Sequence, residues 1–246
     1  MVSAPEDAAS RAAELSSRVG AATARVLATA AQISDDQAHQ PSLLPGWTRG
    51  HVLTHLARNA DGLANLLIWA RTGIVTPQYS SAEIRDEQIE AGAGRPAAVL
   101  SADVAESAMT FAAEAARLTD ADWNAEVRGI RGAGHPAWYT LWRRLSELEI
   151  HHVDLDAGYR PVDWPADFVG DCLPLVADAF SGDRCQAALL RTAGDGGEYR
   201  IGPPADAPAV TVTGPSRSLL AWLLGRASDR ALAVEPPGPL PAVPPW

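Results

Sequence analysis

The sequence predicts an α+β protein, with a helical bundle over residues 1–160 followed by a small mixed α/β domain over residues 161–246. Two observations support this division. Apolar residues recur at helical spacing through the first part of the chain, with short Pro/Gly-rich connections between the periodic stretches. After the break "GYRPVDWP", short β-like stretches appear, and the end of the chain is proline-rich. A length of 246 residues fits one large domain or two ordinary ones.

Four long helices with short connections indicate a bundle. The second of them should begin at Thr48, whose hydroxyl can cap the helix, and should end at Gly73. The segment "RGIRGAGHP" is expected to form a turn or a small hairpin. The predicted helices of the bundle, including one short stretch before the third long helix, cover residues 5–33, 48–72, 81–92, 96–118 and 137–157.

The second domain should start with a helix over residues 165–181. Three β-like stretches then follow, "QAALLRT", "EYRIG" and "AVTVT". A further helix is expected over "GPSRSLLAWLLGRASDR", with Ser216 as its cap. The tail "EPPGPLPAVPPW" contains too many prolines for regular structure and should lie extended over the surface.

Composition excludes several classes of partner. The formal net charge is −10 and the chain contains no lysine, so nucleic acid and anionic membranes should repel it. No apolar run reaches the ~18–20 residues that a membrane span needs, and the acidic N-terminus lacks a signal pattern, so we expect a cytoplasmic protein. Cys172 and Cys185 have no CxxC spacing and are interpreted as ordinary, partly buried thiols.

The six histidines are unevenly distributed, and four of them lie in two close pairs. His51 and His55 share a face of the second long helix, because four residues nearly complete one turn. In the fourth long helix, the stretch "SELEIHHVDL" allows two Glu–His pairs, Glu147 with His151 or Glu149 with His152. One such pair plus a histidine from the second helix would supply the three protein ligands of a catalytic zinc site. Spacing alone leaves the pair open, although His55 is the better candidate on its helix.

Four stretches of the chain resemble the mycothiol-dependent maleylpyruvate isomerases, which belong to a wider superfamily of zinc-binding, DinB-like four-helix bundles. The stretches are "SLLPGWTRGHVLTHLARNA", "WARTGIVTPQY", "TLWRRLSELEIHHVDL" and "LLGRASD". The resemblance runs from about residue 40 to residue 230, and the proline-rich, tryptophan-containing tail also matches. It implies a DinB-like bundle for the first domain.

The resemblance also implies the roles of individual residues. The zinc ligands of the family fall on His55, Glu147 and His151. An arginine in a "GR-x-SD" context would be the catalytic and substrate-binding residue of the second domain, here Arg226. Such an arginine suits a dianionic substrate because its planar fork binds a carboxylate in two places. Arg85 also matches the family pattern and is a further expected substrate-binding residue. Asn59 and Asp154 lie one helical turn from the proposed ligands, so we expect Asn59 to bind substrate and Asp154 to orient a ligand, as we expect of His51. The family does not require His152.

The resemblance implies a zinc- and mycothiol-dependent enzyme, with one Zn²⁺ per chain, acting on a small dicarboxylate. In the implied reaction, the thiolate of mycothiol adds to the conjugated cis double bond of maleylpyruvate. The resulting single bond rotates, and loss of the thiolate gives fumarylpyruvate. A mycothiol S-transferase acting on another electrophile would share zinc and thiol, whereas a regulator with a structural zinc ion would normally use four ligands. We expect the protein to act as a monomer.

Overall fold

The computed structural model describes residues 8–130, 133–194, 196–204, 210–226 and 231–245. The chain divides into two compact units, Met1–Gly158 and Tyr159–Trp246, and each is described by itself. The first unit is helical and the second carries a small mixed sheet, which confirms the predicted α+β class. None of the described helices combines the length and the apolar character needed to cross a membrane.

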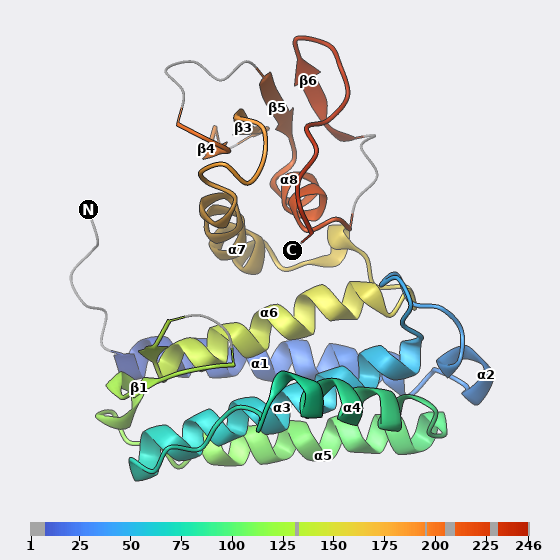
Figure 1. The fold of residues 1–246 in the computed structure, drawn as a ribbon, viewed down its shortest axis with the longest axis vertical. Coiled ribbons are helices and arrows are strands. Elements are labelled where there is room, and N and C mark those ends of the chain that lie inside the picture. The colour runs from blue at the N-terminus through green and yellow to red at the C-terminus, as the bar shows by residue number, and fades with distance from the viewer. Residues whose placement is uncertain (1–7, 131–132, 195, 205–209, 227–230, 246) are drawn as a thin grey trace. The chain divides into compact units, whose positions relative to one another are not determined.

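The first unit contains four long helices that run alongside one another (Figure 1). Helix α3 packs against α5 and α6, and α1 packs mainly against α6. The long helices are α1 (Ala8–Ala30), α3 (Arg49–Thr72), α5 (Ala97–Ala115) and α6 (Trp138–Asp154), and the short ones are α2 (Asp35–Ala38) and α4 (Ala82–Ala93). The predicted bundle is thus present; residues 5–7, which were assigned to the first helix, lie outside the described part of the chain.

Both predicted ends of α3 are confirmed. The Thr48 side chain accepts a hydrogen bond from the backbone N–H of His51, and the His51 side chain accepts one from the backbone N–H of Thr48. Gly73 ends the helix in the left-handed conformation, with a φ of 70°. This capping fixes where α3 starts and therefore which of its residues face α6.

Helix α4 lies close against α3 because glycines at the contact have no side chains. A Cβ atom at Gly50 would overlap the carbonyl oxygen of Ala93, and one at Gly92 would come within 2.5 Å of the Thr54 methyl group. Only glycine permits this approach of the two backbones. The close packing brings the side chains of α4 next to the middle of α3.

A two-stranded antiparallel hairpin joins α5 to α6. Its strands are β1 (Glu126–Val127) and β2 (His135–Pro136), and a 3-10 turn at Asp122–Asn124 precedes it. The sequence predicts a turn or a small hairpin here, and the structure shows the hairpin. Residues 131 and 132 lie outside the described part.

The second unit consists of two helices and a four-stranded sheet. The strand order is β4-β3-β5-β6, with β3 and β5 parallel and the two outer strands antiparallel to their neighbours. The three β-like stretches of the sequence form β3, β4 and β5, as predicted. The elements are a 3-10 turn (Pro161–Asp163), α7 (Ala166–Ala179), β3 (Ala188–Thr192), β4 (Glu198–Ile201), β5 (Val210–Gly214), α8 (Ser216–Leu223) and β6 (Ala233–Glu235).

Two predictions for the second unit are wrong in detail. Ser216 does not cap α8: it is the first residue of the helix, Pro215 precedes it, and no side chain caps this end. Proline suits the residue before a helix because its φ is fixed and it has no N–H to satisfy. The helix ends at Leu223, well before the predicted end at residue 230, and residues 227–230 lie outside the described part. The short strand β6 was not predicted, because three residues beside prolines carry no alternating pattern.

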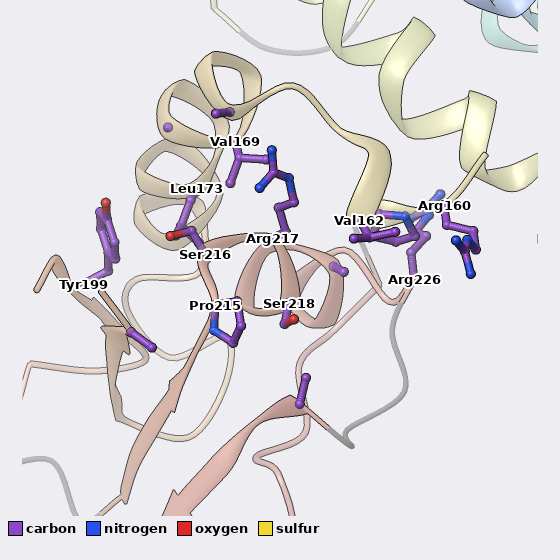
Figure 2. A pocket seen from close by; sticks show the side chains of 16 residues that line it. Arg160, Val162, Val169, Leu173, Tyr199, Pro215, Ser216, Arg217, Ser218 and Arg226 are labelled. Atoms are coloured by element: carbon purple, nitrogen blue, oxygen red, sulfur yellow. The ribbon is translucent and has the colours of Figure 1, made fainter. Parts of the chain in front are cut away.

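A cavity of about 690 Å³ lies between α7 and α8 in the second unit (Figure 2). Apolar side chains of α7, including Val169 and Leu173, form one wall. Residues from the start of α8 and from the turn that precedes α7 also contribute to the lining. The cavity thus belongs to the second unit, whereas the cluster described next lies entirely in the first.

Candidate metal centre

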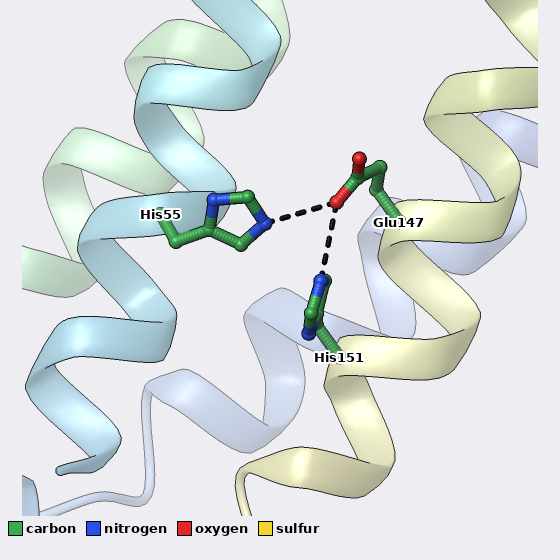
Figure 3. Close-up of side chains that lie close together, drawn as sticks. All are labelled: His55, Glu147 and His151. Carbon is green, nitrogen blue, oxygen red and sulfur yellow. Dashed lines mark hydrogen bonds and ion pairs between the residues drawn. The ribbon is translucent and has the colours of Figure 1, made fainter. Parts of the chain in front are cut away.

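Three side chains from two helices converge in the first unit (Figure 3). His55 extends from α3, and Glu147 and His151 extend from α6 at the spacing of one helical turn. The Nε2 atom of His55 lies 2.9 Å from Oε2 of Glu147, and Nε2 of His151 lies 3.2 Å from the same oxygen. One ligand atom from each residue lies within 4.8 Å of the others. The arrangement is therefore a candidate site for one metal ion.

The structure selects one of the two Glu–His pairs that the sequence left open. Glu149 and His152 point toward α1, where Glu149 pairs with Arg25 and His152 Nε2 lies 2.8 Å from the hydroxyl of Thr29. Both residues are buried there. Helix α6 thus uses one pair to pack against α1 and offers the other pair to His55.

The donor set fits a zinc ion. In a tetrahedral zinc site the ligand atoms lie about 2.0–2.2 Å from the metal, which places them roughly 3.3–3.5 Å from one another. The two measured separations of 2.9 and 3.2 Å need only a small expansion to reach this geometry. The side chain of His55 is buried, but those of Glu147 and His151 are 27% and 18% exposed. Three protein ligands with one accessible side are typical of a catalytic site, which keeps a coordination position open.

Asp154 fixes the orientation of His151. Its Oδ2 atom lies 2.8 Å from Nδ1 of His151, and its side chain is almost fully buried. Burial alone would lower the pKa of His151, but hydrogen bonds to Asp154 and Glu147 outweigh it and raise that pKa to about 9. With its Nδ1–H donated to Asp154, the imidazole presents Nε2 to the cluster, as a metal ligand requires. The expected orienting role of Asp154 therefore has a direct geometric basis.

Glu147 and His55 have pKa values shifted downward, for different reasons. Burial favours the neutral form of Glu147, but its hydrogen bonds to His151 and His55 dominate and hold its pKa well below the usual value. The pKa of His55 is lowered mainly by burial and secondly by the nearby His151. A carboxylate and a neutral imidazole are the forms that bind metal ions, so both shifts favour coordination.

Arg85 of α4 reaches the same cluster. Its Nη2 atom lies 3.3 Å from Nδ1 of His55, and its Nη1 atom pairs with Asp86 at 2.5 Å. A guanidinium can only donate, so Nδ1 of His55 accepts this bond and its Nε2–H is donated to Glu147. The indole of Trp47 lies beside His55, with ring centroids 5.6 Å apart. Arg85 and Trp47 therefore contact the same imidazole, and Arg85 places a positive charge beside it.

Comparison with known proteins identifies the family of this chain. A model of the mycothiol maleylpyruvate isomerase N-terminal domain matches residues 19–156, and a model of the C-terminal domain of the same family matches residues 163–245. The chain belongs to the mycothiol maleylpyruvate isomerase family. A search of curated proteins found no match.

Two solved structures share the complete fold. One is the crystal structure of the mycothiol-dependent maleylpyruvate isomerase, and the other is a histidine-to-alanine mutant of that isomerase. Each is 28% identical to this chain, with a TM-score of 0.87, and the match covers 96% of this chain and 97% of the other. The likeness therefore includes both units.

Two residues that the sequence analysis placed near the ligands have other contacts. Asn59 is 2% exposed, and its Oδ1 atom accepts a hydrogen bond of 2.9 Å from Arg144. It has little surface to offer a substrate, so we assign it to positioning Arg144. His51 pairs with Glu90 at 3.1 Å and belongs to the cap of α3. The His51 ring stacks on the indole of Trp47, and the same indole lies beside His55. An effect of His51 on the ligand His55 would therefore pass through Trp47.

The remaining predicted residues lie in the second unit. Arg226 lines the α7–α8 cavity, and its Nη1 atom donates to the carbonyl oxygen of Leu224 at 2.5 Å. Its role toward the substrate of the family stays a prediction. Cys172 is buried in α7, where burial raises the pKa of its thiol to about 12, and burial also raises the pKa of the partly exposed Cys185. The two cysteines are free thiols and are poor nucleophiles at neutral pH.

Sequence reasoning missed three residues of the site region. Trp47 could have been found, because it precedes the cap of α3 at helical spacing from His51 and His55. Arg144 gave a signal too, as an arginine within the apolar stripe of α6; it is fully buried and its Nη1 atom donates to Leu56 O and Asn59. Tyr79 gave none, because it lies in a loop; burial and the nearby charge of Glu147 raise its pKa.

Proposed function

We propose that this protein catalyses the mycothiol-dependent isomerisation of maleylpyruvate to fumarylpyruvate, with one zinc ion held by His55, Glu147 and His151. The observation that carries the proposal is the convergence of these three side chains in a chain that belongs to the isomerase family along nearly its whole length. All three ligands come from one chain. A single copy can therefore form the metal centre, and we propose that the enzyme is a monomer.

The two absent groups would supply the reactive chemistry: zinc would keep the mycothiol sulfur deprotonated, and the thiolate would add reversibly to the conjugated double bond so that it can rotate. Neither of the two cysteines in the sequence suits this task. Cys172 and Cys185 belong to the second unit and have raised pKa values. An external thiol is therefore consistent with the chemistry of the described residues.

The first unit orients His151 for metal binding but holds His55 in the other tautomer. Asp154 holds the tautomer and the ring orientation of His151. His55 carries its proton on Nε2 while Arg85 donates to its Nδ1. If Nε2 of His55 served as the metal ligand, the proton of the neutral imidazole would have to lie on Nδ1, which would then not accept from Arg85. Metal loading would therefore release the Arg85 guanidinium from His55.

A released Arg85 would lie beside the metal centre with donors available for a carboxylate. We assign it to holding one carboxylate of the substrate and to stabilising the negative charge that develops on the ketone oxygen. Arg226 is assigned to the substrate as well, on the resemblance of its "GR-x-SD" context alone. These two arginines suit a dianion, because each guanidinium can bind one carboxylate.

The test is conversion of maleylpyruvate to fumarylpyruvate, followed by absorbance with and without mycothiol, together with the zinc content of the same sample. We expect turnover that requires mycothiol and is lost in His55→Ala along with the zinc. His39→Ala is the matched control, because His39 is exposed and bonds to a carbonyl of its own turn. It should keep both zinc and turnover. A folded, zinc-loaded protein without turnover would refute the isomerase assignment.

The products distinguish the alternatives. An isomerase regenerates mycothiol in every cycle, whereas an S-transferase would accumulate a stable conjugate with an electrophile. A structural zinc site in a regulator would normally be closed by four ligands, while this cluster has three ligands among the described residues and an accessible side. Mass spectrometry of the thiol pool after the reaction separates the first two cases.

A further inference from the structure

A separate cavity, of about 450 Å³, lies in the first unit between α1, α5 and α6. Its volume is within the range of roughly 300–1,000 Å³ that small-molecule sites occupy. Small residues leave the space open. Helix α5 contributes Ala105, Ala108 and Ala112 at helical spacing, and α1 contributes Gly20, where an added Cβ would meet no atom within 4 Å. This α1–α5–α6 cavity is therefore a gap that the packing of three helices leaves unfilled.

The lining of the cavity is almost entirely apolar and contains one charged side chain, Arg144. Two hydroxyl groups of α1 add polarity, and no carboxylate is among the described lining residues. Arg144 is fully buried, whereas Met109 of the same lining is exposed, so the cavity leads from the surface to an arginine at its inner end. The large apolar residues of the lining are Val19, Leu27, Phe111 and Leu141.

One edge of the Arg144 guanidinium has no partner. Its Nη1 atom donates to the carbonyl oxygen of Leu56 at 2.8 Å and to Oδ1 of Asn59 at 2.9 Å. Its Nε and Nη2 atoms are buried and have no hydrogen-bond partner among the described residues. These two nitrogens form one edge of the planar group, and their N–H groups can bind both oxygens of a carboxylate. Buried donors without acceptors are unfavourable, so this edge calls for an acceptor from outside the chain.

Arg144 also lacks a counter-ion. Burial lowers its pKa to about 10, so the guanidinium is charged at neutral pH. Glu147 and Asp61 raise that pKa from a distance, but Glu147 is paired in the metal centre and Asp61 with Arg58. In the described part of the chain, neither carboxylate forms an ion pair with Arg144. A buried charge is stable only when it is paired, and a ligand carboxylate would supply the missing charge.

We propose that the α1–α5–α6 cavity binds an aliphatic monocarboxylate, whose carboxylate pairs with the free edge of Arg144 and whose chain lies along the apolar walls. One free edge accommodates one carboxylate. The lining offers no second cation among the described residues, so a second carboxylate would be buried without a partner. The site is separate from the metal centre and does not rest on the proposed isomerase function.

The size of the cavity suits a chain of about eight carbons. At about 30 Å³ per heavy atom, which is the volume of one water molecule in the liquid, the ten heavy atoms of octanoate need roughly 300 Å³. A further hollow between α1 and α5 shares Ala105 with the cavity, so a longer chain has room to continue along the two helices. Octanoate is therefore a suitable probe.

The experiment measures the binding of octanoate to the full-length protein by isothermal titration calorimetry, with 1-octanol and acetate as the ligands that lack the charge or the chain. Arg144→Met removes the charge at similar length. Gly20→Leu keeps Arg144 and adds a side chain to the lining, and a leucine favours the helix more than a glycine does. The matched controls are Arg191→Met, because Arg191 pairs with Glu198 at an exposed site of the second unit, and Ala113→Leu, because Ala113 is exposed on α5 and does not line the cavity. Thermal unfolding verifies that each variant is folded.

Octanoate should bind more tightly than either comparison ligand. Arg144→Met should weaken octanoate binding by roughly 10-fold or more, because it removes charged hydrogen bonds, and Gly20→Leu should weaken it by a similar factor through loss of space. Both controls should bind octanoate as the wild type does. Wild-type affinity in a folded Arg144→Met or in Gly20→Leu would overturn the proposal. A wild-type protein that does not bind octanoate at millimolar concentration would also overturn it, and water alone would then satisfy Arg144. If Arg144→Met does not fold, Gly20→Leu and the comparison with 1-octanol decide.

Discussion

Replacing Asp154 should weaken zinc binding in a graded way. The carboxylate accepts a hydrogen bond of 2.8 Å from His151 and is almost fully buried, so solvent cannot replace it. A hydrogen bond to a charged group contributes about 1.5–3 kcal/mol and a neutral one about 1 kcal/mol. Asp154→Asn keeps a neutral acceptor and should lose roughly 1 kcal/mol, or about fivefold in zinc affinity. Asp154→Ala loses the whole bond, which corresponds to roughly 10- to 100-fold.

The pH of the measurement matters, because protons compete with zinc for His151. Its pKa is raised to about 9, so at pH 7 the imidazole is protonated and must release a proton before it can bind. Wild-type zinc affinity should therefore rise with pH up to about 9 and then level off. Removing Asp154 also removes a cause of the raised pKa, so part of the loss is cancelled at pH 7. The full effect of Asp154→Ala should appear at pH 9.

The assay is competition with a chelator of known zinc affinity at pH 7 and pH 9. Asp156→Asn is the control, since Asp156 is exposed, pairs only with Arg49 among the ion pairs of the described residues, and has a φ of 49°, which asparagine tolerates. Circular dichroism and thermal unfolding verify the fold of each variant. Wild-type zinc affinity in Asp154→Ala at pH 9 would refute the orienting role. An affinity that does not change between pH 7 and pH 9 would refute the raised pKa.

Three further predictions concern other parts of the molecule. Arg85→Met should lower kcat/KM for maleylpyruvate by roughly 10- to 150-fold, the equivalent of about 1.5–3 kcal/mol for a charged hydrogen bond; an unchanged steady-state rate would remove Arg85 from the substrate site. The double variant with Cys172→Ala and Cys185→Ala should keep mycothiol-dependent turnover. In the wild type, iodoacetamide should leave Cys172 unmodified at pH 8, because a thiol of pKa about 12 is only about one part in 10⁴ thiolate at that pH. Rapid labelling of Cys172 shown by mass spectrometry would contradict its burial. Gly50→Ala should lower the free energy of unfolding by about 1–3 kcal/mol or more, because the new methyl group overlaps a carbonyl of α4; chemical denaturation measures this, and Gly20→Ala, where the space is open, should not destabilise.

Helix positions were predictable because local signals specify them. Thr48 and Gly73 delimit α3 by side-chain capping and by the left-handed conformation, and both act within a few residues of the chain. The prediction for α8 failed for a related reason: a serine after a proline looks like a cap, but Pro215 already occupies the position before the helix. Local rules thus predict that a helix exists with more certainty than they predict the residue at which it begins.

The choice between the two Glu–His pairs could not be made from spacing. Both pairs obey helical periodicity. Burial does not distinguish a metal-binding pair from a pair that only packs, because Glu149 and His152 are the more buried pair. They are buried against Arg25 and Thr29 of α1, whereas Glu147 and His151 are turned toward His55. Family resemblance indicated the pair that lies next to His55 in the structure, and the packing of three helices supplies the physical reason for that placement.

By itself, the sequence determined the helical bundle, the change to a mixed α/β unit, the family and the residue types suited to zinc, since periodicity, caps and motifs are written along the chain. Only the tertiary structure decided which side chains meet. It showed that Arg85 reaches His55 across glycine-mediated packing of α4 on α3, that Asn59 is committed to Arg144, and that Arg144 itself lines an apolar cavity. These contacts join residues far apart in the chain, and their geometry depends on the packing of whole helices, which no local pattern encodes.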